Sequence, residues 1–181
     1  YKNLILENLI DVQDDGSFKM NMDYFNFCAG LTMTSKKFHK LFGGPPRKPE
    51  SSLTQKEMDL ARSVQEVTEE IIHKMARHVK KETGMDYLCL AGGGALNCVA
   101  NGKLLRSGLF DDIWIQPAAG DAGGALGSAL FAWHQYLDNS RKADNQTDFM
   151  KGAYLGPQFQ NGTIESYLNQ NSYPYTKLND D

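Results

Sequence analysis

The 181-residue sequence lacks the features that mark several common classes of protein. It has no basic excess: 19 Lys and Arg stand against 22 Asp and Glu, whereas a nucleic-acid-binding protein needs a basic patch or stripe. It has no run near the ~18 apolar residues of a membrane span, and its first residues lack a basic segment and a signal cleavage site. These absences predict a soluble, cytoplasmic protein that binds neither nucleic acid nor membranes.

Cysteine and histidine are also scarce. The three cysteines, Cys28, Cys89 and Cys98, form no CxxC pair, and two of them lie in segments that the apolar pattern predicts to be buried, so reduced thiols are expected. The four histidines include no pair spaced four apart, and no GxSxG segment is present. The sequence therefore offers no local metal-ligand pair and no covalent nucleophile. Its first residue is Tyr, which favours a segment of a longer protein.

What is present is an ordinary globular composition, 41% hydrophobic and 23% charged, which predicts one main core. Residues 18–27 are aromatic and partly alternating, which favours a strand or an edge hairpin. Residues 43–50, GGPPRKPE, predict a loop.

Residues 54–82 show the spacing of one long amphipathic helix. Thr54 and Glu57 fit a capping box at its start, and Gly84 fits its end. The residues expected on its buried face are Leu60, Val64, Val67, Ile71 and Met75. The charged residues expected largely elsewhere are Glu66, Glu69, Glu70, Lys74 and Lys80.

Two strand–turn–helix units follow. A short apolar run at 87–90 ends in glycines and precedes a helical pattern at 97–108, and residues 112–137 repeat the scheme with a strand at 113–116. Two such units in succession predict a βαβα core and an α/β fold. The polar segment from residue 138 predicts a linker.

The first turn places Gly92, Gly93 and Gly94 between a strand and a helix. Backbone N–H groups at a helix start can bind phosphate, and glycines let a ligand approach the backbone. A tight, closely packed turn without ligand explains the glycines equally well. Neither a Walker loop nor the dinucleotide fingerprint fits, because Asn97 stands where each requires glycine.

The second turn, residues 118–124, carries one acidic residue, Asp121, among small residues. A carboxylate at the end of a strand can bind a metal ion, although an N-cap is the reading that the local pattern favours. Gly123, Gly124 and Gly127 fit close packing of the following helix. The two turns are expected to converge on one pocket for a nucleotide and a cation.

Residues 88–130, LCLAGGGALNCVANGKLLRSGLFDDIWIQPAAGDAGGALGSAL, resemble the signature of the O-carbamoyltransferases of nodulation and antibiotic biosynthesis. Supporting segments are residues 41–50, 59–70 and 154–159, so that the resemblance covers about residues 18–160. It implies the actin, hexokinase and heat-shock-chaperone type of ATPase fold. Residues 1–150 would form the C-terminal lobe of that domain, with the long helix and the βαβα core, and residues 151–181 a linker and the start of a truncated domain.

The resemblance also implies a chemistry. Family members combine ATP and carbamoyl phosphate into carbamoyl-adenylate in a second domain, and the ATPase-like domain transfers the carbamoyl group to an acceptor hydroxyl. By resemblance, Gly92, Gly93, Gly94 and Asn97 lie against the nucleotide. The resemblance also implies that Asp121 is one ligand of a divalent metal, usually iron, with Mg²⁺ as the alternative. A metal ligand is then the favoured interpretation of Asp121, in place of an N-cap.

Two departures from the family pattern restrict what is expected of this segment. Gly94 stands where the family usually has Val, and the HxxxH pair that supplies the other metal ligands is absent. The N-terminal lobe and the carbamoyl-adenylate-forming domain are thus the missing partners, and the segment alone is expected to be inactive. Two other readings stay open: a nucleotide-dependent switch or scaffold of the actin and chaperone type, and a sugar-kinase relative.

Overall fold

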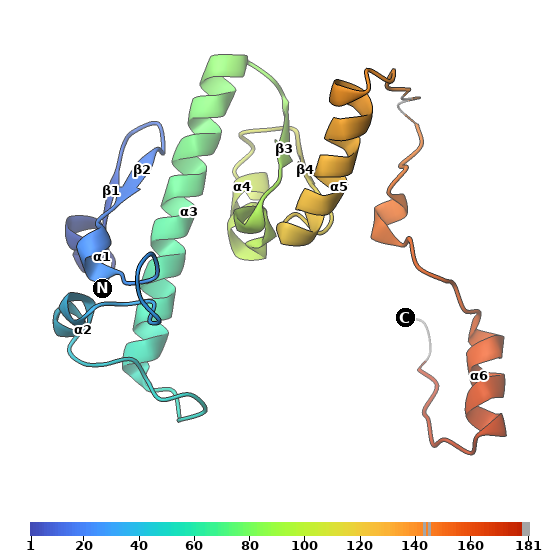
Figure 1. Cartoon of the computed structure of the whole chain (residues 1–181), viewed down its shortest axis with the longest axis horizontal. Helices are drawn as coiled ribbons and strands as arrows, with labels where there is room; N and C mark the ends of the chain where they lie inside the picture. The colour runs from blue at the N-terminus through green and yellow to red at the C-terminus, as the bar shows by residue number, and fades with distance from the viewer. Residues whose placement is uncertain (143, 145, 179–181) are drawn as a thin grey trace. The chain divides into compact units, whose positions relative to one another are not determined.

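A computed structural model describes residues 1–142, 144 and 146–178, and the chain divides into two compact units, Tyr1–Ser128 and Ala129–Asp181 (Figure 1). The first unit begins with short elements: α1 (Lys2–Asn8), β1 (Ile10–Val12), β2 (Phe18–Met20), the 3-10 turn η1 (Met22–Tyr24) and α2 (Lys36–Leu41). It continues with α3 (Gln55–Thr83), β3 (Tyr87–Leu90), the 3-10 turn η2 (Gly93–Leu96), α4 (Cys98–Arg106), β4 (Asp112–Ile115) and α5 (Asp121–Phe131), whose last turn reaches the second unit.

The helix α3 is the longest element, with 29 residues and a length of about 43 Å. At its start the Glu57 carboxylate accepts the Thr54 backbone N–H at 2.9 Å. It ends at Gly84, whose φ of +66° is left-handed and whose N–H donates to the Lys80 carbonyl. The predicted helix, its capping box and its glycine stop are confirmed.

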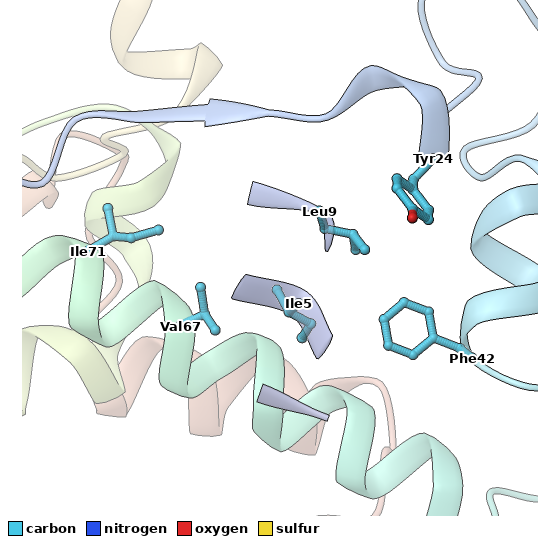
Figure 2. Packing of buried hydrophobic residues seen from close by; sticks show 6 residues of the cluster. All are labelled: Ile5, Leu9, Tyr24, Phe42, Val67 and Ile71. Carbon is cyan, nitrogen blue, oxygen red and sulfur yellow. The ribbon is translucent and has the colours of Figure 1, made fainter. Parts of the chain in front are cut away.

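The N-terminal segment packs on one part of α3. Strands β1 and β2 form an antiparallel hairpin, with Asp11 opposite Lys19. The strand or edge hairpin expected over residues 18–27 is thus confirmed only for Phe18–Met20, since η1 follows. Figure 2 shows the buried side chains of this region gathered between α1, α3 and the segments that follow the hairpin: Ile5, Leu9, Tyr24, Phe42, Val67 and Ile71. Residues 43–50 form no regular element, as predicted.

The βαβα core is also confirmed. Strands β3 and β4 are parallel, with Leu88 opposite Ile113, and α4 forms the crossover between them. Leu104 of α4, 1% exposed, packs with Ala76 of α3 and Phe110. In Figure 1 the hairpin and α1 lie on one side of α3, and α4 with the strand pair lies on the other.

Three sequence-based expectations are wrong. The first unit has two clusters of buried residues instead of one main core. The helix α3 is long enough to pack against the N-terminal segment in one cluster and against α4 in the other. On α3, Val64 and Met75 are exposed, whereas Glu69 is buried. Cys89 and Cys98, in segments expected to be buried, are exposed, since the short strand β3 and the start of α4 each leave one side uncovered; all three cysteines are free, as expected.

The second unit contains a π-helical turn, η3 (Ala132–Tyr136), a 3-10 turn, η4 (Lys151–Ala153), and α6 (Asn161–Gln170). Lys177 returns to α6 and pairs with Glu165 at 2.7 Å. The domain boundary at residue 150 and the start of a further domain at 151 stay predictions, and positions 143, 145 and 179–181 of these segments lie outside the described residues. In the part of the chain that is described, no helix combines the length and apolarity needed to cross a membrane.

Candidate functional site

The parallel pairing of β3 and β4 brings the two glycine-containing turns to the same edge of the sheet. Gln116, just after β4, donates its N–H to the Leu90 carbonyl at the end of β3, at 3.0 Å. The Gly92 N–H then donates to the Ala119 carbonyl at 2.9 Å and joins one turn directly to the other. The two turns are therefore adjacent, which is what a shared ligand site requires.

The three glycines of the first turn are not equivalent. Gly92 has φ +91° and ψ 165°, a conformation that is almost confined to glycine. Gly93 and Gly94 lie outside the left-handed region, and a Cβ added at either would meet no atom within 4 Å. Close packing within this chain thus does not require glycine at 93 or 94, which favours the ligand explanation over the packed turn.

Asn97 lies where the first turn enters α4. Its Oδ1 accepts the Ala100 N–H at 3.1 Å, so that Asn97 is the N-cap of the helix. Its Nδ2 donates to Gln65 Oε1 at 2.9 Å, and Gln65 Nε2 donates back to Asn97 Oδ1 at 3.0 Å. The Asn97 amide is therefore engaged within the protein, while the first N–H groups of η2 and α4 have no partners inside their helices.

Asn101 supports the same turn from inside α4. Its Nδ2 donates to the Ala95 carbonyl at 2.7 Å, and the residue is 7% exposed. Its Oδ1 is buried and has no hydrogen-bond partner among the described residues. The Asn101 amide thus holds the turn at Ala95, while the Asn97 amide fixes the point at which the turn enters α4.

Gly94 also borders an open apolar cavity of about 670 Å³ between α3 and the N-terminal hairpin. The walls consist mainly of Leu, Ile, Val, Phe and Met side chains. Such walls do not suit phosphate groups, which need donors or positive charge. The polar part of a nucleotide is therefore expected at the exposed N–H groups of the turn and not in this cavity.

The second turn presents Asp121 at the first residue of α5. Its side chain is exposed, and no hydrogen bond of its carboxylate is found among the described residues. Ala118 precedes it with a left-handed φ of +52°, and Gly123 is glycine because a Cβ there would lie 2.5 Å from the Ala118 carbonyl oxygen. The packing expected at Gly124 and Gly127 is not observed, since a Cβ at either would meet open space.

The donor set does not complete a metal site. Within residues 1–142, 144 and 146–178 no group of three His, Cys, Asp or Glu side chains is placed to share an ion. Catalytic sites for metals such as zinc usually take about three protein ligands, and Asp121 supplies one. The described residues therefore do not hold a metal by themselves.

Sequence reasoning missed the contacts behind the first turn. Gln65 Nε2 also donates to Glu69 Oε1 at 3.0 Å, and Lys103 of α4 pairs with the other oxygen of Glu69. The Lys103 ammonium and then the Gln65 amide hold the pKa of the Glu69 carboxyl below its usual value. Helical periodicity places Glu69 on the solvent face of the helix. Its partner Lys103 lies 34 residues away, and no local sequence pattern predicts that contact.

Comparison with known proteins relates this arrangement to one family. A family model described as "Carbamoyltransferase N-terminus" matches residues 1–130. Among curated proteins, "Uncharacterized protein sll1178" of Synechocystis sp. is 60% identical over 168 residues, 93% of this chain and 27% of that protein.

Two nodulation proteins are similar as well. Nodulation protein NolO of Bradyrhizobium diazoefficiens is 57% identical over 108 residues, 60% of this chain and 19% of that protein. Nodulation protein NolNO of Sinorhizobium fredii is 37% identical over 153 residues, 84% of this chain and 20% of that protein. The chain thus spans between 19% and 27% of the length of these relatives.

Proposed function

The chain belongs to the carbamoyltransferase family, and from this we propose that it forms part of an enzyme that carbamoylates an acceptor hydroxyl with ATP and carbamoyl phosphate. Carbamoyl-adenylate is the proposed intermediate. Residues 1–150 are assigned to the C-terminal lobe of an actin-type ATPase-like domain, within the N-terminal part of such an enzyme. Family membership supports a transferase over the two other functions considered, a nucleotide-dependent switch or scaffold and a sugar kinase.

In the proposed reaction the acceptor oxygen attacks the carbamoyl carbon of the adenylate, the bond from that carbon to the phosphate oxygen breaks, and AMP leaves. The acceptor proton passes to a base, and no protein nucleophile is required. The role proposed for this chain is to hold the AMP phosphate at the N–H groups of the first turn. A metal at Asp121 would need donors beyond those that residues 1–142, 144 and 146–178 supply.

The observation that supports this proposal is the open space over Gly93 and Gly94, beside the turn that carries Asp121. A phosphate seated on backbone N–H groups needs that space, whereas a purely structural turn does not. The proposal is consistent with the exposure of all three glycines of the turn.

Substitution of Gly93 tests the nucleotide role in the complete enzyme. Because a Cβ at 93 meets no protein atom, Gly93→Ala is expected to leave the unfolding midpoint unchanged and to weaken AMP binding roughly tenfold or more, as a methyl group enters the phosphate position. Calorimetric titration with AMP measures this effect. Gly127→Ala, at another open glycine of the same unit, is the matched control and is expected to bind AMP normally.

If Gly93→Ala binds AMP as tightly as the natural protein, the first turn is not the nucleotide site. The transferase proposal has its own assay, in which carbamoyl transfer from carbamoyl phosphate and ATP is followed with a panel of hydroxyl acceptors. Sugar phosphorylation, or ATP-driven closure without carbamoyl transfer, would favour one of the two other readings.

A further inference from the structure

The first turn is connected to α3 by a chain of side-chain amides. Asn97 and Gln65 exchange two hydrogen bonds, at 2.9 and 3.0 Å, across 32 residues of sequence. The Asn97 oxygen in this pair also caps α4 by accepting the Ala100 N–H. One residue of α3 therefore contacts the point at which the turn becomes helix.

The orientation of these two amides is set at both ends, by the Glu69 carboxylate and by the Ala100 N–H. An ionised carboxylate is purely an acceptor, so Glu69 requires the Gln65 amino group to face it. With Gln65 in that orientation, its carbonyl oxygen accepts from Asn97, and the Asn97 oxygen points at the Gln65 amino group and the Ala100 N–H. A reversed Asn97 amide would set an NH₂ group against the Ala100 N–H.

Lys103 completes the chain on the other side. Its ammonium pairs with Glu69 Oε2, and it lies on α4, whose first turn Asn97 caps. Glu69 is 7% exposed and accepts from both Gln65 and Lys103, which stabilises its charged form. The helix α4 is thus attached to α3 at two points, one at its cap and one in its second turn.

We propose that Gln65 is a positioning residue for the nucleotide: held by Glu69, it fixes Asn97 and so presets the direction of the N–H groups at the first turn. This inference rests on the proposed function, because it assumes that a nucleotide phosphate binds those groups. Preset donors lose less conformational freedom when the ligand binds, and this strengthens binding without a direct contact.

The test uses the complete enzyme with three variants at this chain of amides. Gln65→Ala removes both bonds to Asn97 and is expected to weaken AMP binding about tenfold. Gln65→Glu is expected to weaken it at least as much, since it places a second carboxylate beside Glu69 and the Asn97 oxygen. The double variant Gln65→Glu with Glu69→Gln restores a donor facing an acceptor between residues 65 and 69 but not toward the Asn97 oxygen, so it is expected to recover part of the loss and to bind AMP more tightly than Gln65→Glu alone.

Gln55→Ala is the matched control. Gln55 lies on the same helix and donates to a carboxylate four residues on, Asp59, at 2.7 Å, as Gln65 does to Glu69. Its removal is expected to leave AMP binding unchanged. The KM for the acceptor is expected to stay constant in all four variants, while the Kd for AMP rises only in the variants at Gln65.

The outcomes separate the two proposals. If Gly93→Ala weakens nucleotide binding but Gln65→Ala does not, the positioning role is wrong and the nucleotide site stands. If neither variant affects binding, the nucleotide site itself is wrong. A double variant that binds no better than Gln65→Glu alone would contradict the polarity argument and leave Gln65 as a packing residue.

Discussion

At the scale of single residues, the first turn shows two different uses of glycine. Gly92 has a backbone conformation that side chains oppose, and its N–H reaches the second turn through that conformation. Gly93 and Gly94 have conformations open to other residues and free space above them. Within this turn, Gly92 therefore contributes to stability, whereas Gly93 and Gly94 leave space for a ligand.

This separation gives a stability prediction. Gly92→Ala is expected to lower the free energy of unfolding by about 1 to 3 kcal/mol, because φ +91° with ψ 165° is strained for any residue with a Cβ. Gly94→Ala is expected to change it by less than about 0.5 kcal/mol. Urea unfolding of the two variants measures the difference, and equal stability would show that Gly92 relaxes to another conformation.

At the scale of elements, α3 organises the first unit. Its 29 residues contribute Val67 and Ile71 to one buried cluster and Ala76 to the other. Gln65 and Glu69 of the same helix contact the cap and the second turn of α4. The orientation of α4, and with it the start of the first turn, depends on polar contacts with α3 as well as on the burial of Leu104.

The Glu69–Lys103 pair predicts a pH dependence. Because the folded-state pKa of Glu69 is lowered, its stabilisation is complete above the ordinary glutamate pKa of about 4.3 and is lost as pH falls through the folded value. Lys103→Met is expected to lower the free energy of unfolding by about 1 kcal/mol at pH 7. The difference in free energy of unfolding between Lys103→Met and the natural protein is expected to shrink as pH falls from about 5 towards 3.

Urea unfolding at a series of pH values checks this, with Lys177→Met as the control. The Lys177–Glu165 pair is the more exposed, with side chains 65% and 34% accessible against 39% and 10% for Lys103 and Glu69. Its removal is expected to have little effect at any pH. A Lys103→Met deficit that stays constant between pH 7 and 3 would mean that the loss comes from packing of the lysine stem.

At the scale of the whole molecule, large apolar side chains are exposed in both compact units. Trp114 is 48% and Tyr87 71% exposed on the strand pair of the first unit, and Phe159 is 66% exposed in the second. An exposed apolar face of this kind marks an interface.

The isolated 181-residue chain is therefore expected to bind an apolar dye such as ANS and to self-associate, because its apolar faces have no cover. It is also expected to show no carbamoyl transfer, since the proposed site takes residues from outside it. The complete enzyme is expected to bind much less dye per residue. Dye titration with light scattering measures both, and a monomeric chain without dye binding would contradict the expectation.

Local patterns in the sequence specify the elements of this protein. Periodicity, the Thr54 capping box and the Gly84 stop define α3, and the two strand–glycine–helix runs define the parallel pair, because these depend on neighbours within a few residues. Contacts between distant segments specify the rest: the Gly92–Ala119 bond, the burial of Glu69 and the orientation of the Gln65 and Asn97 amides. From the sequence alone, a polar residue on a helix is predicted to face solvent. Its hydrogen-bond partner can lie far away in the sequence, so only the tertiary structure shows that it is buried.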